Sequence, residues 1–571
     1  MNHTFHRSPT VLLDDATPGA EKCLRFAGNC GVIRAEQAED VPAALAAVER
    51  ERAQGRFVAG YFSYELGLLL EPKLGPLLPA RRAVPLIWLG VFERVEQDGL
   101  EARGRAYAGP LRHEWDAAGY HARFARVRRY IEAGDIYQAN LSFRSRFAFA
   151  GDPVALYARL RARSNAAYGA YIDDGERQIL SLSPELFFDL AADGNITARP
   201  MKGTIARGAD PVSDAATRAT LAASEKDRAE NLMIVDLLRN DLGRIAEIGS
   251  VRVEDLFAIE TYPTLHTMVS TVKARLGPGA DAATILRAVF PCGSVTGAPK
   301  IRAMEIVHEL EASPRGIYCG AIGMFAPDGS AKLNVAIRTL TIQGGEGELG
   351  IGGAVVQDSS AQAEFDECLL KARYYEAARR PIALIETFRS DGGRTERHLA
   401  RMAASAKAFG IPFDRARLVL PACREPSRVR VALDESGAFQ VAVAPLGEAQ
   451  TRWTYAISPR RVNGSDALAR HKTNWREHLE PLPGVDETIF LNERGEVAEG
   501  SRSTVFVRRG GLLLTPPLDA GVLDGVLRAV LIEEGRCREA ALMPRDLAEG
   551  EVLLGNSLRG LIEAVPLLET V

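Results

Sequence analysis

A proline at position 381 divides this chain. Apolar side chains recur at helical spacing over residues 361–379, and the run ends in Arg379-Arg380-Pro381. Proline lacks the N–H that a helix interior needs, so the helix has to stop there. A β-rich run over residues 382–388 follows at once. Because 571 residues are too many for one hydrophobic core, the chain predicts separate folding units that meet at this proline.

Short β-rich runs alternate with amphipathic helices on both sides of the break. The clearest helix covers residues 224–242, with Ser224 as N-cap and Asp227 in the reciprocal capping position. Its expected apolar face holds Leu232, Ile234, Val235, Leu238 and Leu242. A polar stretch near residue 450 marks a second seam. We therefore expect a first domain over residues 1–378 and a second over residues 382–571, itself split near residue 450.

Several classes of protein are disfavoured by the sequence. The net charge of −4 gives no basic footprint for nucleic acid. Apolar runs such as residues 86–92 are too short to span a bilayer, and residues 1–10 lack the apolar core of a secretory signal. The seven cysteines show no CxxC spacing, which favours reduced thiols. We expect a cytoplasmic protein that binds neither nucleic acid nor membranes.

Two helices each place acidic residues three positions apart. Asp227 pairs with Glu230, and Glu364 pairs with Glu367. Residues at i and i+3 share a helix face, so four carboxylates from two helices could converge on Mg²⁺. Taken alone, however, such pairs are more typical of solvated helix faces.

Nine motifs occur in order between residues 135 and 356. They are DIYQANLSFR (135–144), SPELFF (183–188), MKGT (201–204), ENLMIVDLLRND (230–241), LHTMVS (265–270), GSVTGAPKIRAMEI (293–306), YCGAIG (318–323), AIRT (336–339) and GIGGAVV (350–356). Together they resemble the chorismate-utilising family of anthranilate, aminodeoxychorismate, isochorismate and salicylate synthases. GYFSYELG (60–67) resembles the N-terminal part of the members that add an amine.

The resemblance implies an α+β fold, a sandwich of two large antiparallel sheets that holds chorismate and Mg²⁺. By motif, the acids at the Mg²⁺ site are Asp227, Glu230, Glu364 and Glu367. The positions that hold the substrate carboxylates are Tyr318, Arg338, Gly352, Gly353 and Lys371. His266 and Thr296 match positions that face the ring. Asp227 stands where the family usually has Glu, one methylene longer.

The motif MKGT separates members of this family. Anthranilate synthases typically have Ala where Lys202 stands, whereas aminodeoxychorismate synthases have Lys. A lysine amine can act as a covalent nucleophile at ring carbon 2, so that ammonia then enters at carbon 4. Glu185 would protonate the departing hydroxyl. Without its flanking motifs, Lys202 would be read as a surface lysine. An anthranilate synthase-like activity remains the alternative.

The sequence carries no GxCxG turn for a glutaminase nucleophile. The family usually obtains ammonia from a separate glutamine amidotransferase subunit, so we expect such a partner.

The second half carries a different set of motifs. They are ETFR (386–389), HLARM (398–402), HKTNW (471–475), FLNERGEVAEGSRSTVFV (490–507), GVLDGVLR (521–528) and LGNSLRGLIEAV (554–565). In this order they resemble the class IV pyridoxal-phosphate family, which includes aminotransferases and aminodeoxychorismate lyase. The resemblance implies a class IV aminotransferase-like α/β domain of two subdomains.

Pyridoxal phosphate needs a lysine, a carboxylate against its pyridine nitrogen and a phosphate cup. Lys472 and Glu499 match the first two. The cup and its surroundings match Arg401, Val526, Leu527, Asn556 and Ser557. Leu527 stands where the family often has Thr or Ser, so a hydroxyl contact is lost.

The two resemblances together imply two successive reactions. Chorismate and ammonia would give 4-amino-4-deoxychorismate, and loss of pyruvate would then give 4-aminobenzoate for folate synthesis. The motifs of the second half do not separate a lyase from a transaminase. A non-catalytic dimerisation module is the other alternative for this half. Class IV relatives are dimers, so a homodimer through the second domain is also expected.

Overall fold

The computed structural model describes residues 9–19, 21–261, 265–448 and 450–567, which form two compact units. The first unit holds the chain up to Leu100, Leu111–Arg146 and Tyr157–Ala378. The second holds Glu101–Pro110, Phe147–Leu156 and the chain from Arg379 on. Residues 1–8, on which the prediction about a secretory signal depends, lie outside the described residues. None of the described helices is long and apolar enough to cross a membrane.

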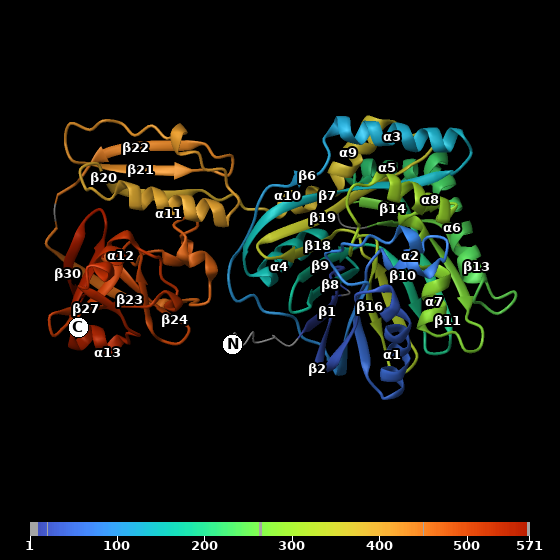
Figure 1. Ribbon diagram of the computed structural model, residues 1–571, viewed down its shortest axis with the longest axis horizontal. Helices are drawn as coiled ribbons and strands as arrows, with labels where there is room; N and C mark the ends of the chain where they lie inside the picture. Colours follow the sequence, from blue (N-terminus) through green and yellow to red (C-terminus); the bar gives the residue numbers. More distant parts are fainter. Residues whose placement is uncertain (1–8, 20, 262–264, 449, 568–571) are drawn as a thin grey trace. The chain divides into compact units, whose positions relative to one another are not determined.

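Antiparallel pairing joins the strands of the first unit into one network (Figure 1). One half runs through β7 (Gln138–Gly151), β19 (Glu346–Val355), β18 (Thr339–Gln343), β9 (Gln178–Ser183), β8 (Tyr168–Asp173) and β1 (Thr10–Asp15). The other runs through β2 (Lys22–Ala35), β4 (Ile87–Glu96), β3 (Phe57–Phe62), β16 (Ala321–Phe325), β17 (Ala331–Val335), β10 (Leu186–Leu190), β11 (Asn195–Arg199) and β14 (Leu265–Arg275). Both β12 (Met201–Ala206) and β13 (Arg252–Thr261) pair with β14. Short strands β6 (Arg112–His113) and β15 (Gly297–Ala298) pair with β7. Strand β5 (Ala106–Ala108) pairs with Phe149–Gly151, and both of these stretches belong to the second unit.

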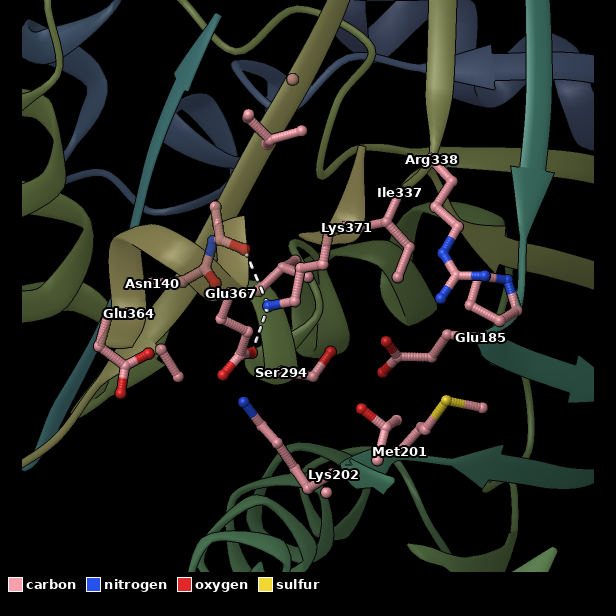
Figure 2. Close-up of a pocket in the computed structure, with 18 of the residues that line it drawn as sticks. Asn140, Glu185, Met201, Lys202, Ser294, Ile337, Arg338, Glu364, Glu367 and Lys371 are labelled. Atoms are coloured by element: carbon pink, nitrogen blue, oxygen red, sulfur yellow. Dashed lines mark hydrogen bonds and ion pairs between the residues drawn. The ribbon is translucent and has the colours of Figure 1, made fainter. Parts of the chain in front are cut away.

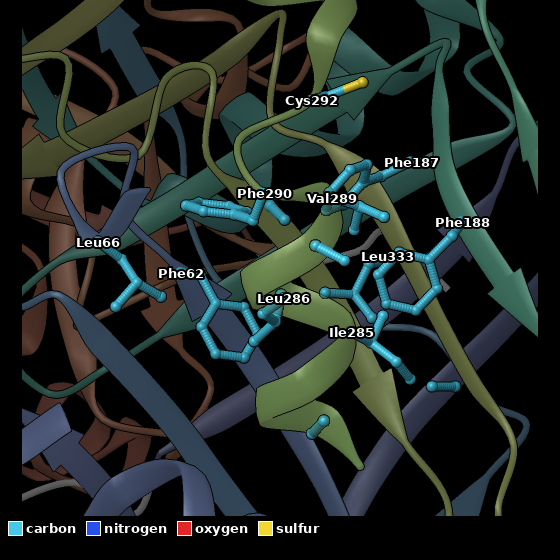
Figure 3. Packing of buried hydrophobic residues seen from close by; sticks show 14 of the residues in the cluster. Phe62, Leu66, Phe187, Phe188, Ile285, Leu286, Val289, Phe290, Cys292 and Leu333 are labelled. Carbon is cyan, nitrogen blue, oxygen red and sulfur yellow. The ribbon is translucent and has the colours of Figure 1, made fainter. Parts of the chain in front are cut away.

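The two halves of this network pack face to face. Val11 and Ile179 from one half share a buried apolar cluster with Tyr61 and Ile322 from the other. The predicted sandwich is therefore confirmed, although β1 and β2 join its two layers by hydrogen bonds. A second cluster lies between the β3-containing layer and the outer helices, where Leu286 contributes from a helix (Figure 3).

Helices cover the first unit. They are α1 (Val41–Ala53), α2 (Leu66–Leu70), α3 (Ala117–Glu132), α4 (Pro153–Ser164), α5 (Pro211–Ala223), α6 (Glu225–Gly243), α7 (Ala282–Val289), α8 (Lys300–Leu310), α9 (Ala361–Lys371) and α10 (Arg373–Ala378).

Helix α6 confirms the predicted cap, because the Ser224 side chain accepts a hydrogen bond from the Asp227 N–H. Of the five residues predicted on its apolar face, Ile234, Val235, Leu238 and Leu242 are buried, whereas the prediction for Leu232 is wrong, because that side chain is 43% exposed. The single helix expected over residues 361–379 is broken into α9 and α10 at Ala372.

The second unit contains two sheets. The first is antiparallel, with β20 (Leu384–Arg389), β21 (Ser427–Leu433) and β22 (Phe439–Pro445), and α11 (Thr395–Ala408) packs on β20. The second is mixed, in the order β25 (Val497–Gly500), β24 (Glu487–Asn492), β23 (Arg452–Val462), β30 (Gly560–Pro566), β29 (Glu551–Asn556), β26 (Thr504–Arg509), β27 (Leu512–Thr515) and β28 (Cys537–Glu539). Helices α12 (Val526–Glu533) and α13 (Pro544–Glu549) accompany it.

Two segments from the first half of the sequence belong to the second unit. Tyr107 is 1% exposed, and its ring meets that of Phe409 edge-on with centroids 5.1 Å apart. The Arg105 guanidinium bonds to Asp466 at 2.7 Å and to the Trp475 carbonyl at 2.8 Å. The second unit is therefore built from three stretches of chain, whereas the sequence reading placed its boundary in one position.

Candidate active sites

The first unit contains a cavity of about 260 Å³ that gathers most of the predicted residues (Figure 2). Those lining it are Glu185, Lys202, Asp227, Glu230, Tyr318, Arg338, Gly352, Glu364, Glu367 and Lys371. They come from strands of the sandwich and from α6 and α9, which are far apart in sequence.

Lys202 lies on β12 and points into the cavity (Figure 2). The next residue, Gly203, has φ +79°, and a Cβ there would lie 2.8 Å from the Asp227 carboxyl carbon. Only glycine therefore lets α6 approach the strand this closely. Burial lowers the pKa of Lys202, and Lys371 acts in the same direction, while Glu230 and Glu185 oppose the shift. The amine is thus driven toward its neutral, nucleophilic form.

Glu185 stands between β9 and β10 and is 4% exposed. Burial raises the pKa of this carboxyl to about 7, against the opposing effects of Ser294 and Lys202. Its Oε1 has no hydrogen-bond partner among the residues that the structure describes. A buried acid that keeps its proton near neutral pH and faces a cavity is suited to general acid catalysis.

Cationic groups face the same cavity. Arg338 sits at φ +50°, and burial lowers the pKa of its guanidinium. Lys371 donates to the Gly352 carbonyl at 3.0 Å and pairs with Glu367 at 2.8 Å. A guanidinium and an ammonium held at fixed positions can bind the carboxylates of an anionic ligand.

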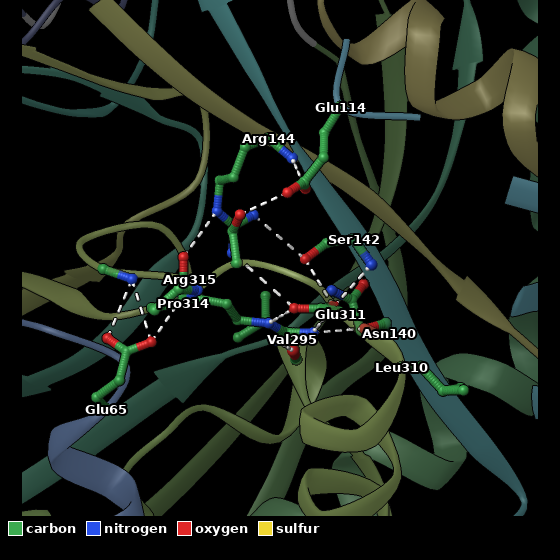
Figure 4. A network of polar contacts seen from close by, with 12 residues as sticks. Glu65, Glu114, Asn140, Ser142, Arg144, Val295, Leu310, Glu311, Pro314 and Arg315 are labelled. Atoms are coloured by element: carbon green, nitrogen blue, oxygen red, sulfur yellow. Dashed lines mark hydrogen bonds and ion pairs between the residues drawn. The ribbon is translucent and has the colours of Figure 1, made fainter. Parts of the chain in front are cut away.

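A buried ionic network surrounds Arg315, three residues before Tyr318 in the chain (Figure 4). Arg315 bonds to Glu311 at 2.7 Å and 2.9 Å and to the Asn140 carbonyl at 2.6 Å. Its backbone N–H donates to Glu65 at 2.7 Å. These charge-assisted bonds hold Asn140, which lines the cavity, and the backbone of Arg315 and Gly316, which lie just before the cavity residue Tyr318 in the sequence.

The four predicted metal acids line the cavity, and three of them, Glu230, Glu364 and Glu367, form ion pairs with lysines. Lys226 lies 3.9 Å from both Glu230 and Glu364, and the Ser359 hydroxyl donates to Glu364 at 2.7 Å. Burial raises the pKa of Glu230 and of Glu364. Among the described residues, no group of three or more His, Cys, Asp or Glu side chains is placed to hold a metal ion. Carboxylate oxygens are ligands that suit Mg²⁺. Lys226 would have to move before these carboxylates could converge on one ion.

Three predicted residues do not line the cavity. His266 is 1% exposed, and its ring nitrogens lie 2.9 Å from Thr261 Oγ1 and 2.9 Å from an Asp214 carboxylate oxygen. The Thr296 hydroxyl donates to backbone carbonyls on its own turn at 3.2 Å. Gly353 adjoins the cavity, since a Cβ there would lie 3.6 Å from Lys371 Nζ.

The second unit contains a cavity of about 460 Å³. All seven residues predicted there line it: Arg401, Lys472, Glu499, Val526, Leu527, Asn556 and Ser557.

Burial shifts the pKa values of Lys472 and Glu499 in the directions that favour the neutral form of each group. Burial, followed by the charges of Arg476 and Arg401, lowers the pKa of Lys472 to about 8. Glu499 is 6% exposed, and burial raises the pKa of its carboxyl to about 7, although Arg476 and the Leu523 N–H oppose the shift. The backbone of Lys472 is anchored, because its carbonyl accepts the Ile385 N–H at 2.8 Å.

The start of α12 faces this cavity. Its N-cap is Gly525, no side chain caps it, and Val526 and Leu527 open the helix. Unpaired N–H groups at a helix start attract a phosphate. Arg401 bonds to Glu386 at 2.8 Å and 2.7 Å and to the Asp524 carbonyl at 2.7 Å, so its guanidinium is fixed beside that start. The lysine, the buried carboxyl and this cup together fit pyridoxal phosphate.

Comparison with known families agrees with both geometries. Residues 93–376 match the model of the chorismate binding enzyme family, and residues 383–565 match that of the class IV amino-transferases. The chain joins a chorismate-binding enzyme domain to a class IV aminotransferase domain. The second domain implies pyridoxal phosphate as its cofactor.

Curated relatives match the chorismate-binding domain. Aminodeoxychorismate synthase component 1 of Klebsiella aerogenes is 48% identical over 248 residues, which are 43% of this chain and 55% of that one. Anthranilate synthase component 1 of Streptomyces coelicolor is 43% identical over 283 residues, 48% of this chain and 55% of that one. The chain thus spans about half the length of these relatives.

A solved structure shares the fold of the first domain. It is a putative 2,3-dihydroxybenzoate-specific isochorismate synthase from Bacillus anthracis, with a TM-score of 0.53 and 20% identity. The match covers 65% of this chain and 96% of that one. At this identity the likeness concerns the fold alone.

Some residues at these sites were not predicted from the sequence. In the chorismate-binding domain they are Ser294 and Lys226, and in the class IV domain they are Arg428 and Arg430. Lys226 has one local signal, its i, i+4 spacing to Glu230. The two arginines also have one, because they alternate with valines in a strand.

Proposed function

We propose that the chorismate-binding domain converts chorismate and ammonia into 4-amino-4-deoxychorismate. The class IV domain then removes pyruvate to leave 4-aminobenzoate, a precursor of folate. The observation that carries this proposal is the presence in one cavity of Lys202 and of Glu185, a buried carboxyl whose pKa is raised to about 7. An amine and an acid so placed can carry out two successive displacements on one ring.

In the first displacement, Lys202 Nζ bonds to ring carbon 2, the ring double bonds shift, and the hydroxyl leaves carbon 4. Glu185 gives that hydroxyl its proton, so it departs as water. In the second, ammonia bonds to carbon 4, the double bonds shift back, and Lys202 is released from carbon 2. The proton lost by the incoming ammonia returns to the carboxylate. Arg338 and Lys371 hold the substrate carboxylates throughout.

Mg²⁺ is part of the proposal for this domain. Asp227, Glu230, Glu364 and Glu367 would hold it once Lys226 has moved toward solvent. A divalent ion there would offset the negative charge of a substrate carboxylate.

In the class IV domain, bound pyridoxal phosphate withdraws electrons from the carbon that carries the substrate amine. Glu499 would lie against its pyridine nitrogen, and the start of α12 together with Arg401 would hold its phosphate. Lys472 Nζ takes the proton from the amine-bearing ring carbon. The ring then becomes aromatic as pyruvate departs.

The proposed reactions also predict which partners the chain has. A glutamine amidotransferase subunit would supply ammonia, as the name "component 1" of the Klebsiella relative supports. We further propose a homodimer through the class IV domain and a cytoplasmic location.

Mass analysis of the products tests the proposal. Purified protein is given chorismate, Mg²⁺, an ammonium salt and pyridoxal phosphate. The expected products are 4-aminobenzoate and pyruvate. Aminodeoxychorismate alone would contradict the lyase half, and 2-aminobenzoate would replace the first half with an anthranilate synthase-like reaction.

A further inference from the structure

The cavity of the class IV domain is strongly cationic. Six arginines line it: Arg401, Arg428, Arg430, Arg476, Arg502 and Arg559. Glu499 is the one carboxylate among its described lining residues. A cofactor phosphate accounts for part of this charge, near Arg401, and leaves a positive excess on the remaining walls.

Arg428 and Arg430 stand two residues apart on β21. Val429 and Val431 between and after them are 3% and 0% exposed and pack in the core beneath α11. Because side chains alternate along a strand, both arginines project from the opposite face, which lines the cavity. Neither guanidinium has a hydrogen bond or ion pair with any residue that the structure describes.

The register of the sheet brings Arg430 close to Lys472, with Arg428 two residues farther along the strand. Thr387 on β20 stands opposite Arg430, and Ile385 on the same strand bonds to the Lys472 carbonyl at 2.8 Å. Two residues along a strand span roughly 7 Å, which is within the reach of an extended arginine. On the other side, Arg430 faces Ala442, whose short side chain leaves the space open.

The arginines nearer the cofactor site are already engaged. Arg401 bonds to Glu386, Arg476 donates to the Ser501 carbonyl at 2.8 Å, and Arg502 donates to the Asp486 carbonyl. The guanidinium of Arg559 lies over the Trp453 ring, 5.6 Å from its centroid. The pair on β21 is thus left to bind a ligand.

We propose that Arg428 and Arg430 bind the two carboxylates of a dicarboxylate amine and so select it over neutral amino acids. This rests on the proposed function, in which the substrate carries a ring carboxylate and an enolpyruvyl carboxylate. A guanidinium binds a carboxylate through two parallel N–H groups, and two such sites on one strand recognise a dianion. A neutral amino acid, the substrate expected of a transaminase, offers only one carboxylate.

Binding of a dianion and a monoanion to the full-length holoenzyme tests this. Isophthalate and benzoate are titrated while the visible absorbance of bound pyridoxal phosphate is followed, so that only the class IV domain is observed. We expect isophthalate to bind more tightly than benzoate. In Arg428→Met/Arg430→Met the preference should fall about 10- to 100-fold. Arg461→Met, which removes an exposed charge outside the cavity, should keep it.

Steady-state pyruvate release from aminodeoxychorismate gives a second readout. Each single variant should raise KM with little change in kcat and an unaltered cofactor band, and Arg430→Lys should recover part of the loss. An unchanged preference and KM in the double variant would overturn the role of the pair. If wild-type protein selects isophthalate but releases no pyruvate, the lyase proposal fails while the role of the pair stands.

Discussion

At the scale of single residues, burial shifts the pKa values of Glu185 and Lys202 in opposite directions, and both shifts favour the neutral form of the side chain. It raises the pKa of the Glu185 carboxyl to about 7 and lowers that of the Lys202 amine. A charge costs more in a buried site than in water, so both groups are favoured in their neutral forms. One cavity therefore holds an acid that can give a proton and an amine that can attack.

Glu185→Gln should reduce the kcat of amination by about 10²- to 10⁴-fold, because the leaving hydroxyl loses its proton donor. The wild-type carboxyl acts in its protonated form, so its kcat/KM should fall as pH rises through about 7. The variant should lose this pH dependence when initial rates are compared from pH 5.5 to 8.5, a range of roughly 1.5 units on either side. Retention of the same profile would rule out this assignment.

Lys202 and Lys472 form a matched pair of tests. Lys202→Ala should abolish amination but leave pyruvate release from added aminodeoxychorismate intact. Lys472→Ala should do the reverse and also remove the visible cofactor band. The two rates are measured separately by mass analysis and by a pyruvate assay. Loss of both activities in either variant would contradict two independent sites.

At the scale of elements, α6 and α9 bring their acidic residues together across the cavity. Glu230 and Glu364 are separated by more than a hundred positions in sequence, and Lys226 lies between them. The lysine side chain is 53% exposed, so water screens its attraction to both acids. It therefore acts as an internal counter-ion, which the proposed Mg²⁺ would have to displace.

Lys226→Gln should strengthen Mg²⁺ binding by on the order of tenfold, since two partly screened ion pairs no longer compete. Titration calorimetry of the protein without substrate measures this directly. Lys273→Gln is the control, because that lysine pairs with Glu254 away from the cavity. Equal or weaker Mg²⁺ binding in Lys226→Gln would exclude the counter-ion role.

At the scale of the whole molecule, the second unit includes two segments from the first half of the sequence. Tyr107 and Arg105 on one of them pack against Phe409, Trp475 and Asp466. Cutting the chain at residue 379 would thus expose part of the core of the class IV domain.

Tyr107→Ala in the full chain should destabilise the class IV domain by about 3–5 kcal/mol, the usual cost of removing a buried aromatic side chain. Urea unfolding followed by the visible cofactor band reports on this domain alone. Tyr137→Ala, at a side chain that is 72% exposed, should change the midpoint little. A midpoint unaffected by Tyr107→Ala would mean that the borrowed segment contributes nothing to stability.

The two folds, the helix start at Ser224 and most of the lysines and acids that line both cavities could be predicted from the sequence, whereas Lys226 could not. These features are carried by motifs whose spacing is local, so they can be read along the chain. The prediction that Leu232 belongs to the buried face is wrong because an apolar residue on a helix is buried only where another element covers it.

Only the tertiary structure decided which distant groups meet. The contact of Lys226 with Glu364, the packing of Tyr107 in the second unit and the direction of Arg428 and Arg430 depend on strand register and helix packing. His266 and Thr296 belong to matching motifs, yet neither lines the cavity, since their hydrogen bonds are made with neighbouring backbone and side chains. Such contacts form between residues far apart in sequence, and no local pattern records which of them will face each other.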